Sequence, residues 1–323
     1  MTRQSTWAWP PIAGAVCAAC LLIGSCAPPG YALGAQAQVS QKPESEAALK
    51  TVVDMTPEEL LRRYRAELAD VEFDAGKEVL KPLLQAVGEK VEAFFHSFSN
   101  TSSKEEVRME RFSSDGRSED STRQEFNYLI LVHSEKAGIQ FEEDRVDSRG
   151  RPIAPKRIKG FFISSGYAGL CMFFHPSHHF GSRFRYLGKQ KSEPHAHVIA
   201  FAQKPEARDY LAGYVGLNST ESTPLLFQGI AWVDPDSQQI LRMRTDLLEP
   251  EFQILLMAQT TEIQYSEVHF GTAPQSYWLP REVSVTWRLG GNTYRNRHRY
   301  SDYKVFSVES FDKIGQPIKK EVP

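Results

Sequence analysis

Histidines are the side chains whose types and spacing in this sequence come closest to a chemical site. His175, His178 and His179 lie close together between two phenylalanines, and His195 with His197 would share one face of a strand. Neutral imidazoles that converge can hold Zn²⁺. Because no carboxylate or cysteine stands at ligand spacing beside them, we interpret the first three as part of a polar loop and predict no metal site.

Two further groups of residues are of types that can act in catalysis. Ser164 and Ser165 are potential nucleophiles, but they lack the flanking pattern of a nucleophile elbow. The acidic run of Glu142, Glu143 and Asp144 offers paired carboxylates, although such runs are usually solvated surface. We therefore predict a protein without catalytic residues and without a cofactor.

Three arginines alternate along one predicted strand, at Arg295, Arg297 and Arg299. They could present a basic stripe to anionic headgroups. The alternative is a solvated face of an antiparallel sheet with carboxylates on neighbouring strands, and we favour it because exposed charge pairs are common. The other face of this strand would hold Tyr294, Asn296, His298 and Tyr300.

Composition narrows the class of protein. Of 323 residues, 41% are hydrophobic and 24% charged, which is typical of a globular protein rather than a disordered or membrane-spanning one. The net charge of −2 leaves no basic surplus to neutralise a phosphate backbone, so no nucleic-acid partner is expected.

The N-terminus predicts export. Arg3 precedes an uncharged apolar run over 12–24, which has the length of a leader core and is too short to span a bilayer. We interpret 1–26 as a signal peptide. Two processing routes remain open: a lipobox ending in Cys26, which would be lipidated and would anchor the protein, or ordinary cleavage after a small-x-small motif within 30–37. The predicted location is the periplasm, free or attached to the outer membrane.

Cysteine usage fits an exported chain with a single thiol in its folded body. The other three cysteines lie in the leader region, which leaves Cys171 alone and rules out an intrachain disulfide. Its neighbours are apolar and none is basic, so we predict a buried, inert thiol.

The order of predicted elements runs from a tether through helices to strands. Residues 27–54 are rich in Pro, Gly, Ala and Gln and predict a flexible tether. Residues 55–103 form the helical N-terminal portion. One helix should begin at the capping residue Thr56 and run to about residue 68, and another should cover 75–98 despite Pro82, which favours a break or a late start. Polar residues 99–103 then predict a turn.

Residues 104–323 predict a β-rich body. The almost wholly apolar segment 126–132 is typical of a strand buried on both faces or under a helix. A hairpin is expected across the turn 234–237. The other predicted strands are 183–189, 195–201, 226–233, 239–245, 260–270, 282–287 and 293–305. Together these patterns predict an α+β fold, with a curved antiparallel sheet or incomplete β-barrel and N-terminal helices.

Several of these segments resemble one known family. The segments are Tyr186-Leu187-Gly188, His197–Phe201, Gly229–Asp234, Ile240–Arg244 and Trp278–Val283. In their strand-and-turn pattern they are similar to the bacterial periplasmic lipoprotein-carrier superfamily, over about a third of the chain. The resemblance implies an incomplete β-barrel with helices over its mouth, an enclosed apolar cavity and a tendency to bind acyl chains. It transfers no individual ligand residue.

Three functional hypotheses follow, in order of preference. The first is a non-enzymatic cell-envelope protein whose half-open barrel binds an apolar ligand such as a lipid, an acyl chain or a lipoprotein; an unfilled apolar cavity would support it. The second is an interaction or sensory module for another envelope protein, supported by an exposed apolar patch. The third is a histidine-metal enzyme, which requires the histidines to converge on one ion.

Overall fold

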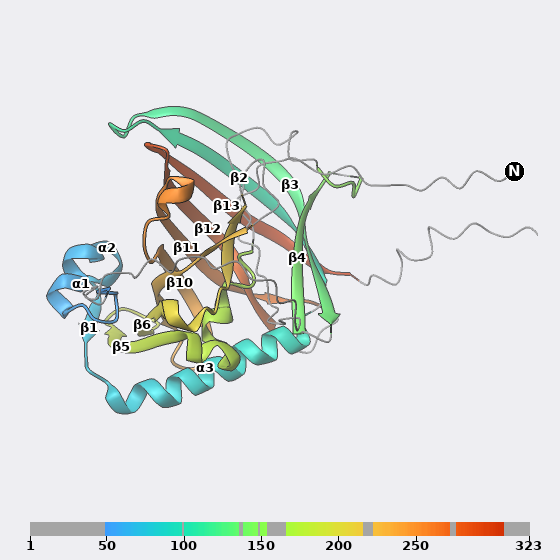
Figure 1. Ribbon diagram of the computed structural model, residues 1–323. Helices are drawn as coiled ribbons and strands as arrows, with labels where there is room; N and C mark the ends of the chain where they lie inside the picture. The colour runs from blue at the N-terminus through green and yellow to red at the C-terminus, as the bar shows by residue number, and fades with distance from the viewer. Residues whose placement is uncertain are drawn as a thin grey trace, which may run out of the picture.

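One large curved sheet dominates the molecule. The computed structural model describes residues 49–98, 100–135, 138–147, 149–153, 166–215, 222–271 and 276–306. Within them the chain forms an antiparallel sheet of eleven strands, a separate two-stranded hairpin and three α-helices. The edge strands β1 and β4 do not pair with each other, so the sheet is an open half-barrel (Figure 1). The predicted α+β fold with an incomplete barrel is confirmed.

The strands of the large sheet follow one another mostly as hairpin neighbours. Their spatial order is β1-β5-β6-β9-β10-β11-β12-β13-β2-β3-β4. The bounds are β1 Val71–Phe73, β2 Thr101–Phe112, β3 Ser118–Glu135, β4 Gly138–Val146, β5 Ser182–Gln190, β6 His197–Gln203, β9 Phe227–Val233, β10 Ile240–Leu247, β11 Leu256–His269, β12 Ser276–Leu289 and β13 Asn292–Val305. The separate hairpin pairs β7 Ala212–Val215 with β8 Ser222–Leu225.

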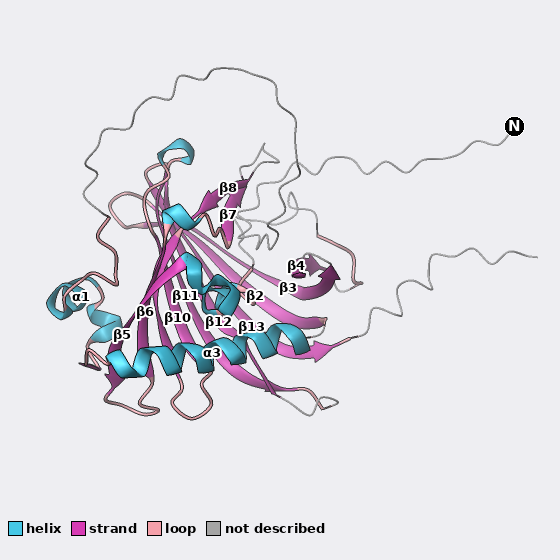
Figure 2. Cartoon of the chain, turned by 60° about the horizontal axis from the view of Figure 1, so that its bottom comes forward, coloured by secondary structure: helices cyan, strands magenta, loops and turns pink. Residues whose placement is uncertain are grey.

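The long helix α3, Lys77–Ser97, crosses the open concave side of the sheet (Figure 2). It buries one apolar face, formed by Leu83, Val87, Val91 and Phe95, against the main core. The helix continues through Pro82 without a break. An interior proline costs about 3 kcal/mol, and burial of each large apolar side chain contributes roughly 1.5–3 kcal/mol, so the buried face outweighs the proline.

Two short helices cover the opposite face of the sheet at one edge. They are α1, Pro57–Arg63, and α2, Arg65–Leu68, and they pack against β5, β6 and β9 in a second core (Figure 1). The start of α1 is the predicted one, because Thr56 and Glu59 form a capping box and Pro57 occupies the first turn. With helices on both sides, every residue of β9 is buried.

An internal segment fills part of the half-barrel between α3 and the sheet. We call residues 166–174 the plug; it includes the 3₁₀ turn η2, Leu170–Phe174, and all of its residues are buried. Phe173 and Phe174 pack on Phe201 of β6, with ring centroids 5.1 and 5.4 Å apart. The remaining 3₁₀ turns are η3 Pro176–Gly181, η4 Pro205–Ala207 and η5 Phe252–Ile254.

Most predicted elements agree with the structure, but two segments of the β-rich part differ from their predictions. Residues 101–103 belong to β2 rather than to a turn, because they pair with β3. The segment 126–132 in β3 is buried on one face only, with Leu129 half-buried, because no described helix covers its outer side. The fully buried strand is β9 instead. The predicted hairpin across residues 234–237 is confirmed as the β9–β10 connection.

The last residues of the expected tether also pack against the fold. Thr51 and Val52 are buried, and the Val52 amide donates to Gln228 Oε1 at 2.7 Å. Asp54 forms an ion pair with Arg183 at 2.6 Å. Residues 51–54 therefore lie with the sheet, while the leader and residues 27–48 fall outside the described residues.

Gly188 tests how tightly β1 is packed on β5. It has φ +136, and a Cβ there would overlap the carbonyl oxygen of Glu72. Gly188→Ala should lower the free energy of unfolding by about 3 kcal/mol, because the cost of the backbone strain and the cost of the overlap with Glu72 add together. The control Gly116→Ala also has positive φ, at +81, but nothing lies within 4 Å, so about 1 kcal/mol is expected from strain alone. Urea unfolding of both variants checks this; equal losses would show that the close contact is unimportant.

Candidate functional site

A cavity lies between the C-terminal half of α3, the plug and strands β10–β12. Its volume is about 320 Å³. From α3, the residues lining it lie on one side of the helix, as their spacing of three and four residues requires. The described lining consists of Lys90, Val91, Ala93, Phe94, Ser97, Cys171, Gln239, Ile240, Tyr265, Ser276, Tyr277 and Trp278.

The side chains that line the deep part of the cavity are mainly aromatic or aliphatic. Tyr277 packs between Phe94 and Phe98, with ring centroids 6.4 and 5.8 Å away, and its hydroxyl donates to the carbonyl oxygen of Ser97 at 2.9 Å. Val91 and Ile240 are each 5% exposed. Because Tyr277 is fixed by packing and by a hydrogen bond, this wall of the cavity is preorganised.

Tyr265 and Cys171 are two buried polar side chains of this lining. Tyr265 is 8% exposed, and its hydroxyl is buried without a hydrogen-bond partner among the described residues. Burial raises the pKa of the Cys171 thiol to about 12, so the thiol stays protonated and is a poor nucleophile. The predicted burial of the cysteine is confirmed, and the structure adds that Cys171 lines a cavity.

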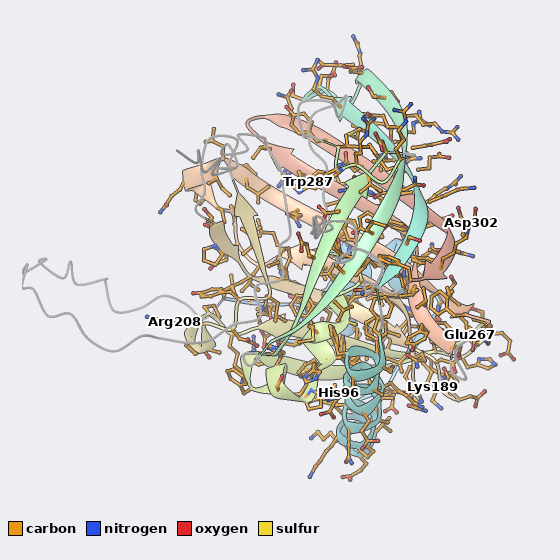
Figure 3. All side chains as sticks on the ribbon, turned by 90° about the vertical axis from the view of Figure 1, so that its right-hand side faces the viewer. His96, Lys189, Arg208, Glu267, Trp287 and Asp302 are labelled. Carbon is orange, nitrogen blue, oxygen red and sulfur yellow. The ribbon has the colours of Figure 1, made fainter. Side chains whose placement is uncertain are left out.

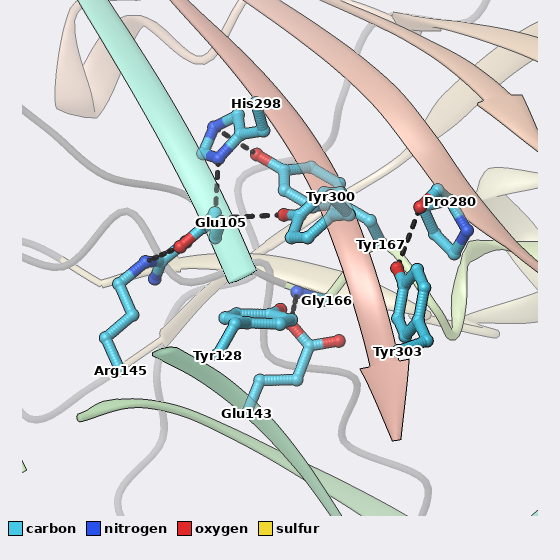
Figure 4. A network of polar contacts seen from close by, with 10 residues as sticks. All are labelled: Glu105, Tyr128, Glu143, Arg145, Gly166, Tyr167, Pro280, His298, Tyr300 and Tyr303. Atoms are coloured by element: carbon cyan, nitrogen blue, oxygen red, sulfur yellow. Dashed lines mark hydrogen bonds and ion pairs between the residues drawn. The ribbon is translucent and has the colours of Figure 1, made fainter. Parts of the chain in front are cut away.

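A second feature of the concave side is a buried network of charged and polar side chains (Figure 4). Arg145 of β4 makes two hydrogen bonds to Glu105 of β2, at 2.6 and 2.7 Å. Burial opposes ionisation of Glu105, but the Arg145 guanidinium and His298 outweigh it and lower the pKa of Glu105 to about 2. The pair is therefore ionised. Arg145 also lies over the rings of Phe126 and Tyr128, at 5.8 and 5.1 Å.

His298 of β13 links this ion pair to the plug. Its Nδ1 lies 2.8 Å from Glu105 Oε1, and its Nε2 lies 3.2 Å from the hydroxyl of Tyr167. Burial lowers the pKa of His298 despite the nearby carboxylate, which favours the neutral ring. A carboxylate can only accept, so Nδ1 carries the proton and Nε2 accepts from Tyr167. Tyr300 donates to the same carboxylate oxygen at 3.0 Å.

Glu143 of β4 holds the first residue of the plug. It accepts hydrogen bonds from the Tyr128 hydroxyl and from the amide of Gly166 (Figure 4). Burial raises the pKa of Glu143 in spite of these donors, and its other oxygen is buried without a partner among the described residues. The plug is thus tied to the sheet at two successive residues, Gly166 by Glu143 and Tyr167 by His298.

The hydroxyl, imidazole and carboxylate of Tyr167, His298 and Glu105 stand in the order of a nucleophilic triad. Their exposure is 3%, 1% and 1%, so no substrate reaches the phenol in this structure. We interpret the network as structural: it satisfies buried charges and positions the plug, which in turn forms one wall of the cavity.

The histidines singled out in the sequence are engaged separately. His178 pairs with Asp209 at 2.8 Å, and His179 Nε2 lies 2.8 Å from the carbonyl oxygen of Phe174. His197 Nδ1 lies 2.9 Å from the Tyr186 hydroxyl. His195 does not share a strand with it, because β6 begins at His197 and His195 closes a turn with φ 58. Across the described parts of the chain, no three His, Cys, Asp or Glu side chains gather as metal ligands.

His175 is the remaining histidine of the predicted loop. Its Nδ1 lies 2.7 Å from Ser177 Oγ and accepts from the amide of Ser177 at 3.2 Å, so it caps the turn η3 that follows. This local role agrees with the interpretation of residues 175–179 as a polar loop.

The other candidate residues of the sequence are two serines, the acidic run and the arginine stripe. Ser164 and Ser165 lie outside the described residues. The acidic run is not uniformly solvated: Glu142 is exposed, whereas Glu143 belongs to the buried network, because alternate residues of β4 face opposite sides. The prediction that the acidic run lies on solvated surface was therefore wrong for Glu143.

The arginine stripe is a charged outer face of the sheet, as favoured. Arg295 and Arg297 pair with Glu110 on β2 at 3.0 and 3.3 Å, and Arg299 pairs with Glu282 on β12 at 3.6 Å. Charged side chains project outward from the strands in Figure 3, among them Asp302.

Sequence reasoning missed Glu105, Arg145 and Tyr167. A signal existed for Glu105, which alternates with Val107 and Met109 and so occupies an inward position of a strand. That signal was ambiguous because the outward positions of the same strand, such as Glu106 and Arg108, are charged as well.

Replacing Glu105 tests how much the network contributes to the free energy of unfolding. Glu105→Gln removes the charge of the carboxylate that accepts two hydrogen bonds from the buried Arg145 guanidinium, so the free energy of unfolding should fall by about 3–5 kcal/mol. The control Glu106→Gln removes a pair with Arg123, which is 64% exposed, and should cost less than about 1 kcal/mol. Urea unfolding at neutral pH compares the two; similar small losses would mean that the buried pair does not stabilise the fold.

Glu143 predicts a pH dependence of opposite sign to that of most carboxylates. Because its folded pKa is raised above the unfolded value, its contribution to stability is full below about pH 4.3 and is lost as pH rises through the folded pKa. Glu143→Gln should therefore gain stability relative to the wild type between acidic and neutral pH. Urea unfolding across that range, with the exposed Glu142→Gln as control, checks it; a constant difference would contradict the raised pKa.

Comparison with known proteins adds a distant structural similarity. No family model matches the sequence, and no curated protein matches it. A Vibrio parahaemolyticus domain named for outer membrane lipoprotein sorting is similar with a TM-score of 0.34 and 12% identity, over 72% of this chain and 96% of that one. A DUF1329 family protein from Desulfovibrio piger is similar with a TM-score of 0.34 and 10% identity, over 71% and 93%.

Proposed function

We propose that this protein is a non-enzymatic cell-envelope protein that binds an apolar ligand, such as an acyl chain, in the cavity beneath α3. The observation that carries the proposal is the space itself: about 320 Å³ remains between α3, the plug and the sheet, bordered by Phe94, Ile240 and Tyr277. Protein cores normally leave few voids larger than a water molecule. A space of this size at the surface of a core is therefore the default position of a ligand.

The size and lining of the cavity favour one slender chain. A cavity of about 150 Å³ accommodates benzene, so about 320 Å³ suits roughly a dozen carbon atoms.

The proposed location is the cell envelope. It rests on the predicted signal peptide at 1–26 and on the alternative lipidation of Cys26, which both lie outside the described residues. Within the described residues, no helix is long and apolar enough to cross a membrane. A tether over 27–48 would space the barrel from a lipid anchor, so the proposed partners are lipids or lipoproteins.

A second candidate function is recognition of another envelope protein. It is favoured by apolar side chains exposed around η5, a turn at one end of the half-barrel, where Phe252 is 69% exposed and Leu255 61%. This alternative also requires a filled barrel interior, and the plug fills much of the interior outside the cavity. The cavity ranks first because a space of about 320 Å³ with a mainly aromatic and aliphatic lining is a more specific feature than a small exposed patch.

Blocking the mouth of the cavity tests the first proposal. Ala93 lies on the exposed side of α3 and also lines the cavity, so Ala93→Trp adds a ring at the mouth without disturbing the core. Affinity for a fluorescent fatty acid should fall roughly tenfold or more, since the loss of even one or two buried methylenes is worth about 1.5 kcal/mol.

The matched control is Ala86→Trp, two turns earlier on the same helix and outside the described lining. It should bind the probe like the wild type, and thermal unfolding should show that both variants are folded. Unchanged binding in Ala93→Trp, or an equal loss in both variants, would contradict a ligand site in this cavity.

A further inference from the structure

The described lining of the cavity carries positive charge at one residue and no negative charge, which concerns the headgroup of a ligand. Lys90 is the one charged side chain in the described lining. It stands on the exposed side of α3, one turn before Phe94 and two before Ser97, so its ammonium lies at the mouth while the deeper lining is uncharged. Long lysine side chains place an apolar stem against such a surface and keep the charge at its edge.

Lys90 also has no internal counterion. No hydrogen bond or ion pair joins it to another described residue, although other cations of the chain, such as Lys50 and Arg183, are paired at 2.6 Å. Glu267, which accepts from Ser276 Oγ of the lining, is also engaged by His269, whose Nε2 lies 3.6 Å away. Lys90 is therefore free to receive an external anion.

We propose that the cavity selects anionic amphiphiles: a single apolar chain lies beneath α3, and its terminal carboxylate or phosphate is bound by the ammonium of Lys90. This inference rests on the proposed function and names the ligand class. The chain length follows from the volume, and the sign of the headgroup follows from the one charge in the lining. The side chain of Gln239 lines the same cavity, and its amide can donate a hydrogen bond to the headgroup oxygens.

The charge and the apolar lining of the cavity have separate roles. Lys90 at the mouth sets a preference for negative charge, whereas buried side chains such as Val91 and Ile240 contact the chain. A neutral chain of the same length should still enter the cavity, because apolar burial provides most of the affinity. Only the contribution of the headgroup should be lost.

The test is a competition assay against a fluorescent fatty acid with the full mature protein. The competitors are dodecanoate, dodecyl phosphate, dodecanol and dodecylamine. For the wild type, both anions should bind roughly fivefold more tightly than the alcohol, as expected for one partly exposed charge pair. The amine should bind more weakly than the alcohol, and high salt should reduce the difference.

Two variants assign the preference to Lys90. Lys90→Gln should bind both anions and the alcohol equally, and Lys90→Glu should favour the amine. The matched control is Lys81→Gln, an exposed lysine on the same helix outside the lining of this cavity, which should keep the wild-type preference.

The outcomes distinguish this inference from the proposed function. Equal binding of anions and alcohol by the wild type, or a preference that Lys90→Gln retains or Lys81→Gln also loses, would overturn the inference and leave the apolar site intact. No binding of any of these chains would overturn the proposed function with it. A preference for one anion over the other would identify the headgroup as a carboxylate or a phosphate.

Discussion

An open, curved sheet exposes an apolar concave face that must be kept from water, and this constraint governs the rest of the structure. The edge strands β1 and β4 do not meet, so strand pairing alone cannot close the interior. The chain covers the concave face with α3 and with the plug, residues 166–174. The cover is incomplete where Ala93, Cys171 and Trp278 surround a space that no described side chain fills. The proposed ligand completes this core.

The buried polar network follows from the same constraint. A segment that runs through the interior brings backbone amides with it, and these need partners. Glu143 accepts from the Gly166 amide, and His298 accepts from Tyr167, so polar contacts fix the first two residues of the plug. Isolated buried charges would be costly, which explains why Glu105, Arg145 and His298 occur as one mutually satisfied group. The network therefore positions the plug, which forms one wall of the cavity, although none of the network residues lines that cavity.

The sequence predicted the fold well because its signals are local. Alternation along 293–305 and helical periodicity over 75–98 depend on neighbouring residues only, and both elements are found at these positions. The predictions were wrong where contacts between distant parts of the chain determine the local structure. His195 and His197 alternate as strand residues should, yet a turn separates them. Glu143 looked like one member of a solvated acidic run, but its partners Tyr128 and Gly166 come from distant parts of the chain. The cavity could not be predicted at residue level, because α3, the plug and β10–β12 meet only in three dimensions.

An apolar chain that occupies the space beneath α3 should remain with the protein on gentle purification. Native mass spectrometry of the protein from its native source, before and after delipidation, would detect it. We expect an additional mass of a single-chain lipid in the first sample that is absent from the second, with a negatively charged headgroup in the released molecule. An identical, ligand-free mass in both samples would contradict a lipid in this cavity and would favour recognition of another protein instead.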